Sequence, residues 1–87
     1  MNKVFLMGKI ISDIQFKFII KAKDKAVIDF KVLTIQDRQI ISVKAYNKMA
    51  DVIYQKLEIN NGIIICGYLK EDKVIIDTCY KISVWKI

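Results

Sequence analysis

The stretch Val43-Lys44-Ala45-Tyr46-Asn47-Lys48-Met49-Ala50 contains the one point where a strand-like hydrophobic pattern gives way to a helical one. Up to Tyr46, apolar and polar residues alternate with the period of two that is typical of a β-strand. From Asn47 to Leu57, apolar residues recur at three- and four-residue spacing, which indicates an amphipathic helix. Because Asn47 is a favourable N-cap, we expect one short helix that begins there and ends near Glu58.

Segments with strand character lie on both sides of this helix. β-branched residues dominate them, and the chain contains no proline. The first segment is long, and we expect it to bend between Gly8 and Asp13 so that it serves two sheets. The five expected strands are 3–20, 26–35, 39–46, 62–70 and 73 to about 85.

The last two strands are expected to form a tight hairpin in which Lys70 pairs with Lys73. This register places Leu69 on the inner face. It also places Cys66 and Cys79 diagonally on one face, so we expect two free thiols and no disulfide.

The order of these elements predicts the fold class. Three strands, one helix and two strands are the order of an all-β, five-stranded OB-fold Greek-key barrel with a short helix between strands 3 and 4. The pattern alone also suits other small barrels. With 87 residues, the chain is expected to be a single domain over 1–87.

Composition favours a polyanionic partner and gives little support to catalysis. Fifteen basic and nine acidic side chains give a net charge of +6, which is typical of nucleic-acid binding but also of a generic basic surface. There is no histidine, there are two cysteines, and the acidic residues are scattered. We therefore expect no metal, no cofactor and no enzymatic activity.

The N-terminus does not resemble a secretion signal. Lys9, Asp13 and Lys17 interrupt every apolar run near it, and the longest apolar run elsewhere is far shorter than a membrane span. We expect a cytoplasmic protein without membrane contact.

Three blocks, in order and at fitting spacing, resemble bacterial single-stranded-DNA-binding proteins. They are Met1-Asn2-Lys3-Val4 with Gly8, the stretch from Val43 to Ala50, and Gly67-Tyr68-Leu69. The resemblance implies the OB-fold and a shortened member of the family. We expect this member to lack two of the family's features: the long loop between strands 4 and 5, replaced by Glu71-Asp72, and the acidic C-terminal tail.

The resemblance also implies a binding site. An aromatic ring at the Tyr46 position stacks on DNA bases in the family, and Tyr68 is a second outward aromatic residue. Ile40 and Ser42 stand where the family commonly has a stacking tryptophan and an arginine, so we expect weaker binding with little base preference. The expected nucleic-acid-binding residues are Lys9, Lys17, Lys31, Arg38, Ile40, Ser42, Lys44, Tyr46, Tyr68, Lys70 and Lys73.

The function expected from this resemblance is sequence-independent binding of single-stranded DNA in replication, recombination or transfer. By the same analogy, we expect a homodimer or homotetramer formed through the first strand, with Phe5 and Met7 at the contact, and possible replication proteins as partners. Two alternatives stay open. One is an accessory subunit similar to primosomal replication protein B, and the other is a protein-interaction barrel without nucleic-acid binding.

Overall fold

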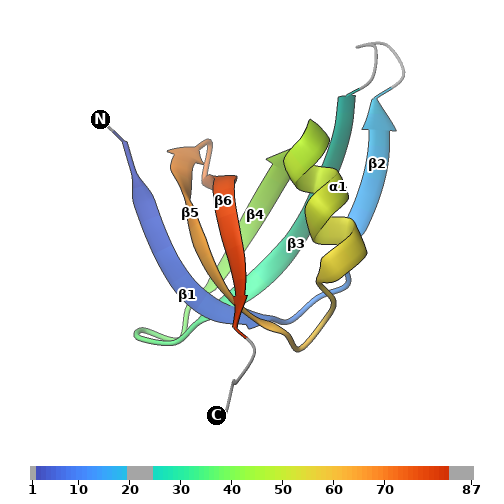
Figure 1. The fold of residues 1–87 in the computed structure, drawn as a ribbon. Helices are drawn as coiled ribbons and strands as arrows, with labels where there is room; N and C mark the ends of the chain where they lie inside the picture. The colour runs from blue at the N-terminus through green and yellow to red at the C-terminus, as the bar shows by residue number, and fades with distance from the viewer. Residues whose placement is uncertain (1, 20–24, 83–87) are drawn as a thin grey trace.

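The computed structural model describes residues 2–19 and 25–82. The expected helix and all five expected strands are present, although the first strand is divided in two (Figure 1). The part of the last strand expected to reach Trp85 lies outside the described residues. The elements are β1 (Val4–Ile10), β2 (Gln15–Ile19), β3 (Lys25–Thr34), β4 (Ile40–Tyr46), α1 (Asn47–Lys56), β5 (Gly62–Lys70) and β6 (Lys73–Ile82).

The strands form one closed sheet. Their order is β1-β5-β6-β4-β3-β2, and a further pairing of β1 with β3 closes the barrel. β4 and β6 are parallel at Val43 and Val74, and the other pairs are antiparallel. This topology, with α1 between β4 and β5, confirms the predicted OB-fold.

The first strand is broken, which differs from the single bent strand that we expected. Ile10 pairs with Val32, and Gln15 pairs with Asp29. Residues 11–14 of the expected first strand therefore lie opposite only two residues of β3, 30 and 31. The regular strand pairing cannot continue across this mismatch. Within the break, the backbone N–H of Lys31 donates to the Ser12 hydroxyl at 2.8 Å, which fixes the turn against β3.

Gly8 lies where β1 passes from one neighbour to the other. It pairs with Ile63 of β5 and with Thr34 of β3. A Cβ at this position would lie 2.5 Å from both the Leu33 carbonyl oxygen and Val32 Cγ1. The close approach of three strands therefore requires a residue without a side chain.

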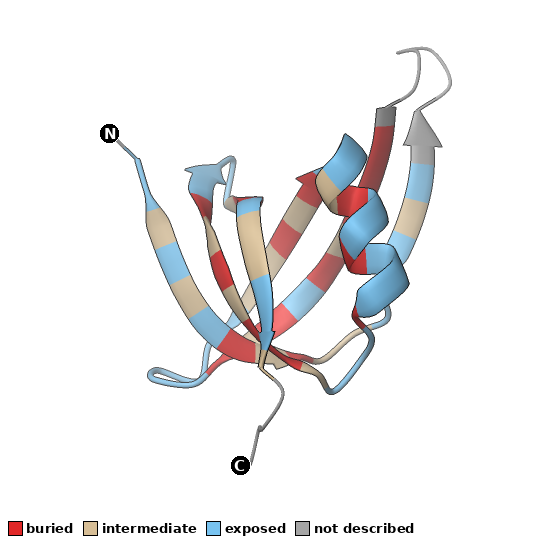
Figure 2. Ribbon diagram, viewed as in Figure 1, coloured by how far each residue is buried: buried red, intermediate tan, exposed pale blue. Residues whose placement is uncertain are grey.

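Inward-facing side chains of every barrel strand except the short β2 segment form the buried core, and α1 covers one end of it (Figure 2). The helix buries Ala50 and Ile53 and packs against β3, β4 and β6. It contains ten residues and is too short and too polar to cross a membrane, and no other helix occurs in the described part of the chain. The fully buried large side chains are Ile10, Ile28, Ile53, Ile63, Ile65, Val32, Val43 and Val74.

The helix starts differently from the expectation. Tyr46, with extended backbone, occupies the N-cap position and makes no side-chain capping bond. Asn47 is the first helical residue, with a φ of 53°. Asparagine tolerates this left-handed conformation better than most residues, so Asn47 allows the sharp turn from β4 into α1 and does not cap the helix.

The hairpin of β5 and β6 begins in the expected register but does not keep it. Lys70 pairs with Lys73, as predicted, but a bulge between Cys66 and Gly67 leaves Asp77 without a direct partner. Beyond the bulge, Cys79 pairs with Ile65 and packs against the core. The expectation of both cysteines on one face was therefore wrong, although both are free thiols as predicted.

Leu69 was expected to face the core and is instead 51% exposed. The pairing of β1 with β5 extends only as far as Val4 and Gly67, so no strand flanks Leu69 on that side. The Asn2 side chain lies there, accepting from the Leu69 backbone N–H at 3.2 Å and donating to its carbonyl at 2.6 Å. The tip of this hairpin therefore projects beyond the barrel.

Candidate nucleic-acid interface

Outward side chains of β3 and β4 form neighbouring pairs across the two strands. Lys31 lies opposite Ser42, and Asp29 lies opposite Lys44. Side chains opposite each other on adjacent strands have Cβ atoms about 5 Å apart, so each pair can contact one ligand.

A surface groove with a volume of about 480 Å³ lies along this face. Lys31, Ser42 and Lys73, all expected in the site, line it together. Four polar residues from the β1–β2 break, β2 and β3 were not expected there. These unexpected residues are Ser12, Asp13, Gln15 and Asp29.

Three expected lysines form a row across four strands, which we call the lysine row: Lys31, Lys73 and Lys70. The parallel pair of Val43 and Val74 places Ser42 beside Lys73, one residue earlier on each strand. Lys73 pairs directly with Lys70 on β5. Strands lie about 4.8 Å apart, so the row spans roughly 14 Å. Like charges placed opposite each other repel, and a bound phosphate relieves that repulsion.

The two expected stacking tyrosines are partly exposed. Tyr46 is 37% exposed and Tyr68 is 36% exposed. Each lies opposite a buried aliphatic residue on the outer face, Val27 for Tyr46 and Ile75 for Tyr68. Burial on an outer face requires cover from neighbouring side chains, and a tyrosine ring directly opposite provides it. About a third of each tyrosine is therefore accessible to a ligand.

The other expected residues lie around the groove and do not line it. Lys17 pairs with Val27 and therefore lies in the same row as Tyr46, whereas Lys44 lies between the groove and that row. At the opposite end of β4, Ile40 and Lys9 both pair with Leu33. Arg38 lies nearby, in the turn between β3 and β4.

The carboxylates of the groove could be found from the sequence only in part. The alternation in β3 already indicates that Asp29 points outward beside Lys31. Asp13 and Ser12 reach the groove only because the ladder breaks between β1 and β2, and no local pattern predicts that break. Ser12 is not available to a ligand, since its hydroxyl accepts from Lys31 and donates to the Asp13 carbonyl at 3.3 Å.

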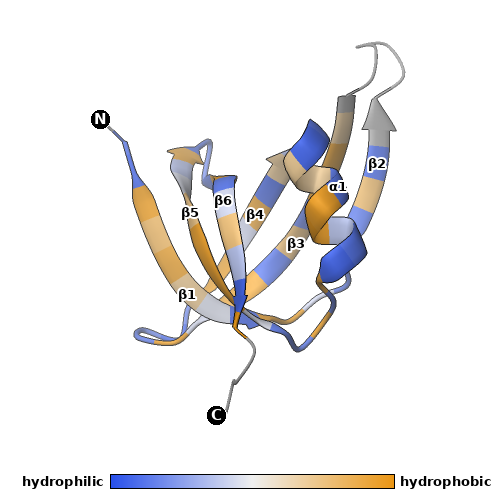
Figure 3. Ribbon diagram, in the orientation of Figure 1, coloured by the Kyte–Doolittle hydropathy of each residue, from blue (hydrophilic) through white to orange (hydrophobic). Residues whose placement is uncertain are grey.

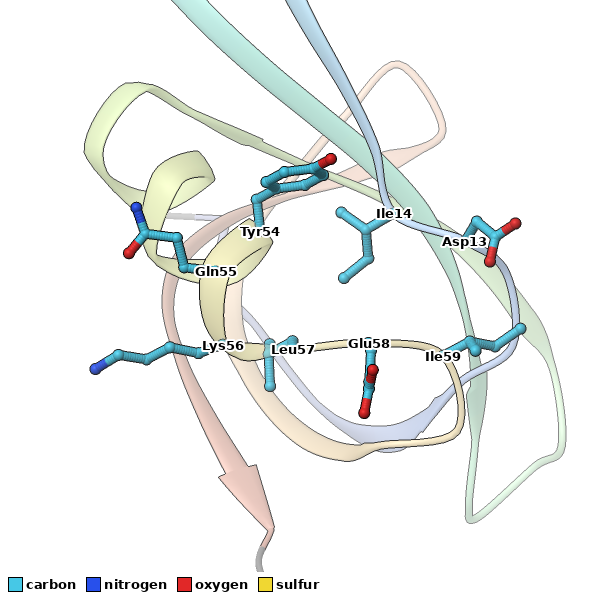
Figure 4. A pocket seen from close by; sticks show the side chains of 8 residues that line it. All are labelled: Asp13, Ile14, Tyr54, Gln55, Lys56, Leu57, Glu58 and Ile59. Carbon is cyan, nitrogen blue, oxygen red and sulfur yellow. The ribbon is translucent and has the colours of Figure 1, made fainter.

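A second hollow, of about 640 Å³, lies between the end of α1 and the β1–β2 break (Figure 4). Tyr54 forms one wall, and its ring packs against Phe16 at a centroid distance of 5.0 Å. Ile14 points toward Tyr54, whereas the Asp13 carboxylate points away from this hollow. None of the expected nucleic-acid-binding residues lines it.

The carboxylates and thiols are dispersed over the part of the chain that the structure describes. No three of its Cys, Asp and Glu side chains are grouped so as to hold a metal ion. Burial raises the pKa of the Cys79 thiol to about 11, which keeps it neutral at physiological pH. The groove offers charged and hydrogen-bonding groups, and Tyr46 and Tyr68 lie outside it on the same face.

Solved structures of single-stranded-DNA-binding proteins resemble this chain. The protein from Thermus aquaticus has a TM-score of 0.87 and 19% identity, with 100% of this chain and 43% of that chain covered. A deletion mutant of that protein has a TM-score of 0.86 and 20% identity, with the same coverage of both chains. The SSB domain of a protein from Synechococcus sp. has a TM-score of 0.83 and 13% identity, with 92% of this chain and 94% of that chain covered.

These likenesses show the fold. This chain spans less than half the length of the Thermus aquaticus protein. No protein-family model matches the chain, and no curated protein matches it.

Proposed function

We propose that this protein binds single-stranded DNA, without catalysing a reaction, on the outer face of β3, β4 and the β5–β6 hairpin. The observation that carries the proposal is that the lysine row shares one outer face with Tyr46 and Tyr68. Cations that follow the phosphates and rings on which bases stack are the two requirements for binding single strands. The similarity of the barrel to solved single-stranded-DNA-binding proteins supports the same function.

The aromatic contribution is tested by replacing Tyr46. Fluorescence anisotropy with a labelled oligonucleotide should show weaker binding by Tyr46→Ala, by about 1–3 kcal/mol for the lost stacking of one base. Tyr46→Phe is the matched control, because it keeps the ring and should bind nearly as well as the wild type. Equal affinities of the alanine variant and the wild type would contradict stacking at this position.

The ionic contribution is tested by a salt titration. Contacts of three lysines with phosphates give a slope of log affinity against log salt of roughly −2, since single strands contribute about −0.7 per phosphate. Lys73→Gln should reduce that slope by about 0.7, whereas Lys48→Gln, on the exposed start of α1, should leave it unchanged. An affinity that does not fall with salt would contradict the proposal.

The biological setting that best fits this activity is replication, recombination or transfer of DNA in the cytoplasm. Phe5 and Met7 of β1 are 68% and 40% exposed, and Figure 3 shows that β1 is hydrophobic along most of its length. We infer self-association through this strand as a homodimer or homotetramer, because a small barrel gains stability when it buries such a surface.

A second candidate function is a protein-interaction barrel, which includes an accessory subunit similar to primosomal replication protein B. Exposed Phe5, together with Tyr80 at 59% exposure, favours it, since large exposed apolar side chains mark contact surfaces. The two candidates differ in the anisotropy titration. Absence of any oligonucleotide binding at low salt would favour the interaction barrel.

A further inference from the structure

The groove contains as many carboxylates as ammonium groups. Asp13 and Asp29 line it together with Lys31 and Lys73. A groove that only followed the phosphate backbone would gain nothing from two carboxylates, because they repel phosphates. Their presence indicates that this part of the groove faces another portion of the nucleotide.

Apart from Ser12, whose hydroxyl is hydrogen-bonded, the uncharged and acidic side chains of the groove have no partners within the described residues. No hydrogen bond or ion pair there involves the side chains of Asp13, Gln15 or Asp29. Gln15 and Asp29 are directly paired on β2 and β3, so their Cβ atoms lie about 5 Å apart. An amide donor and a carboxylate acceptor therefore lie side by side and are available to a ligand.

A base stacked on Tyr46 would have an edge near this pair. Tyr46 lies opposite Val27, and Asp29 is two residues further along the same face of β3. Two residues of a strand span roughly 7 Å, which is about the width of a base. The ring of Tyr46 and the carboxylate of Asp29 are thus placed to contact the face and the edge of one nucleotide.

We propose that this groove prefers bases that carry an exocyclic amino group, such as cytosine, over thymine and uracil. The inference rests on the proposed binding of single strands and names the base that the site favours. A carboxylate only accepts hydrogen bonds, and the cytosine N4 amino group donates them, whereas thymine and uracil present the O4 carbonyl oxygen at that position. The Gln15 amide N–H can donate to the adjacent cytosine N3, which accepts.

The experiment compares oligo-dC with oligo-dT of equal length by anisotropy, at slightly alkaline pH so that cytosine stays unprotonated. The wild type should bind oligo-dC about fivefold more tightly, the lower end of the discrimination expected from one good base contact. Asp29→Asn should abolish most of this ratio, because its amide can also donate to thymine O4. An oligonucleotide of N4,N4-dimethylcytosine, which cannot donate, should bind the wild type no better than oligo-dT.

Asp51→Asn is the matched control, since Asp51 is exposed on α1 and its loss changes net charge equally. It should leave the ratio of the two affinities unchanged. Equal or tighter binding of oligo-dT by the wild type would overturn the base preference while leaving the proposed function intact. A cytosine preference that survives in Asp29→Asn would overturn the assignment to this carboxylate. Binding of neither oligonucleotide would overturn the proposed function and the preference together.

Discussion

At the residue scale, Thr34 determines the geometry of the turn that carries Arg38. It is the one polar residue among the buried positions in the described residues. Its hydroxyl donates to Asp37 and accepts from the Gln39 backbone N–H at 3.0 Å, while its own N–H donates to the Gln39 carbonyl. One side chain thereby satisfies both ends of the turn between β3 and β4.

Replacement of Thr34 by valine keeps the shape of the side chain and removes the hydroxyl. The Gln39 N–H loses its partner, so we expect the free energy of unfolding to fall by about 1–3 kcal/mol. Chemical denaturation monitored by circular dichroism measures this. Thr78→Val is the control, because Thr78 is half-buried and makes no side-chain hydrogen bond within the described residues; it should change stability far less. Equal effects of the two changes would mean that the turn network contributes nothing.

The Cys79 thiol makes stability depend on pH in the alkaline range. Burial raises its pKa from 9.0 to about 11 in the folded protein. Well below pH 9 the thiol is protonated in both states. Between about pH 9 and 11 the unfolded chain loses the proton while the folded protein keeps it, so stability falls with rising pH. Because the thiol is only partly buried, we expect a loss of about 1 kcal/mol.

The test is to measure the free energy of unfolding by chemical denaturation, under reducing conditions and across this pH range, for the wild type and two variants. Cys79→Ala should lose less stability than the wild type as the pH rises, and Cys66→Ala should lose the same amount as the wild type. Parallel curves for all three proteins would contradict the assignment to Cys79.

At the element scale, local pattern predicts strands and turns well and predicts their breaks poorly. Alternation identified the buried face of β3 and β4, and the two-residue turn fixed the pairing of Lys70 with Lys73. The bulge beside Gly67 brings two strands into close contact: a Cβ there would collide with the Ile75 carbonyl of β6. Such contacts are not visible in either strand alone, so the face of Cys79 could not be predicted. Leu69 keeps its predicted register with Val74 but is exposed because the pairing of β1 with β5 ends at Gly67.

The hairpin turn that presents Lys70 and Lys73 is built from unfavourable residues. Glu71 and Asp72 have φ values of 50° and 66°, a left-handed conformation that a two-residue turn requires and that Asn-Gly adopts most easily. The double change of Glu71→Asn with Asp72→Gly should therefore stabilise the protein by about 1 kcal/mol. Thermal unfolding measures this, and the reverse order, Glu71→Gly with Asp72→Asn, should stabilise it less. A melting temperature of the Asn-Gly double variant below that of the wild type would contradict backbone strain at Glu71 and Asp72.

At the scale of the whole molecule, the candidate site exists only because the barrel closes. The alternation of inward and outward residues along each strand correctly predicted four surface residues on two adjacent strands: Lys31, Ser42, Lys44 and Tyr46. The parallel pairing of β4 with β6 then brings Lys73 beside Ser42, and the broken first strand brings Asp13 to the same groove. These long-range contacts have no local signal, which is why the sequence indicated a purely basic groove and the structure shows a mixed one.

The same closure leaves one face of the barrel unpartnered. Before Gly8, β1 pairs only with β5. The Met7 carbonyl still accepts from the Ile35 N–H on the other side at 3.1 Å, so that edge is open over Val4–Leu6 in the described part of the chain. Phe5 lies opposite Cys66 and Met7 opposite Ile64, both half-buried, so an apolar surface extends from this edge across β5. An open edge beside an apolar face is a site where a second copy can pair.

We expect the wild-type protein to sediment as a dimer or tetramer and the Phe5→Glu variant as a monomer, because a charge on this face opposes its burial. Analytical ultracentrifugation over a range of concentrations measures the change. Val52→Glu is the control, since Val52 is 46% exposed on α1, away from β1, and should leave the assembly unchanged. Circular dichroism establishes that the Phe5 variant is folded, which is expected because its side chain lies outside the core. A wild type that sediments as a monomer at high concentration would contradict self-association, and an oligomer that persists in Phe5→Glu would place the contact elsewhere.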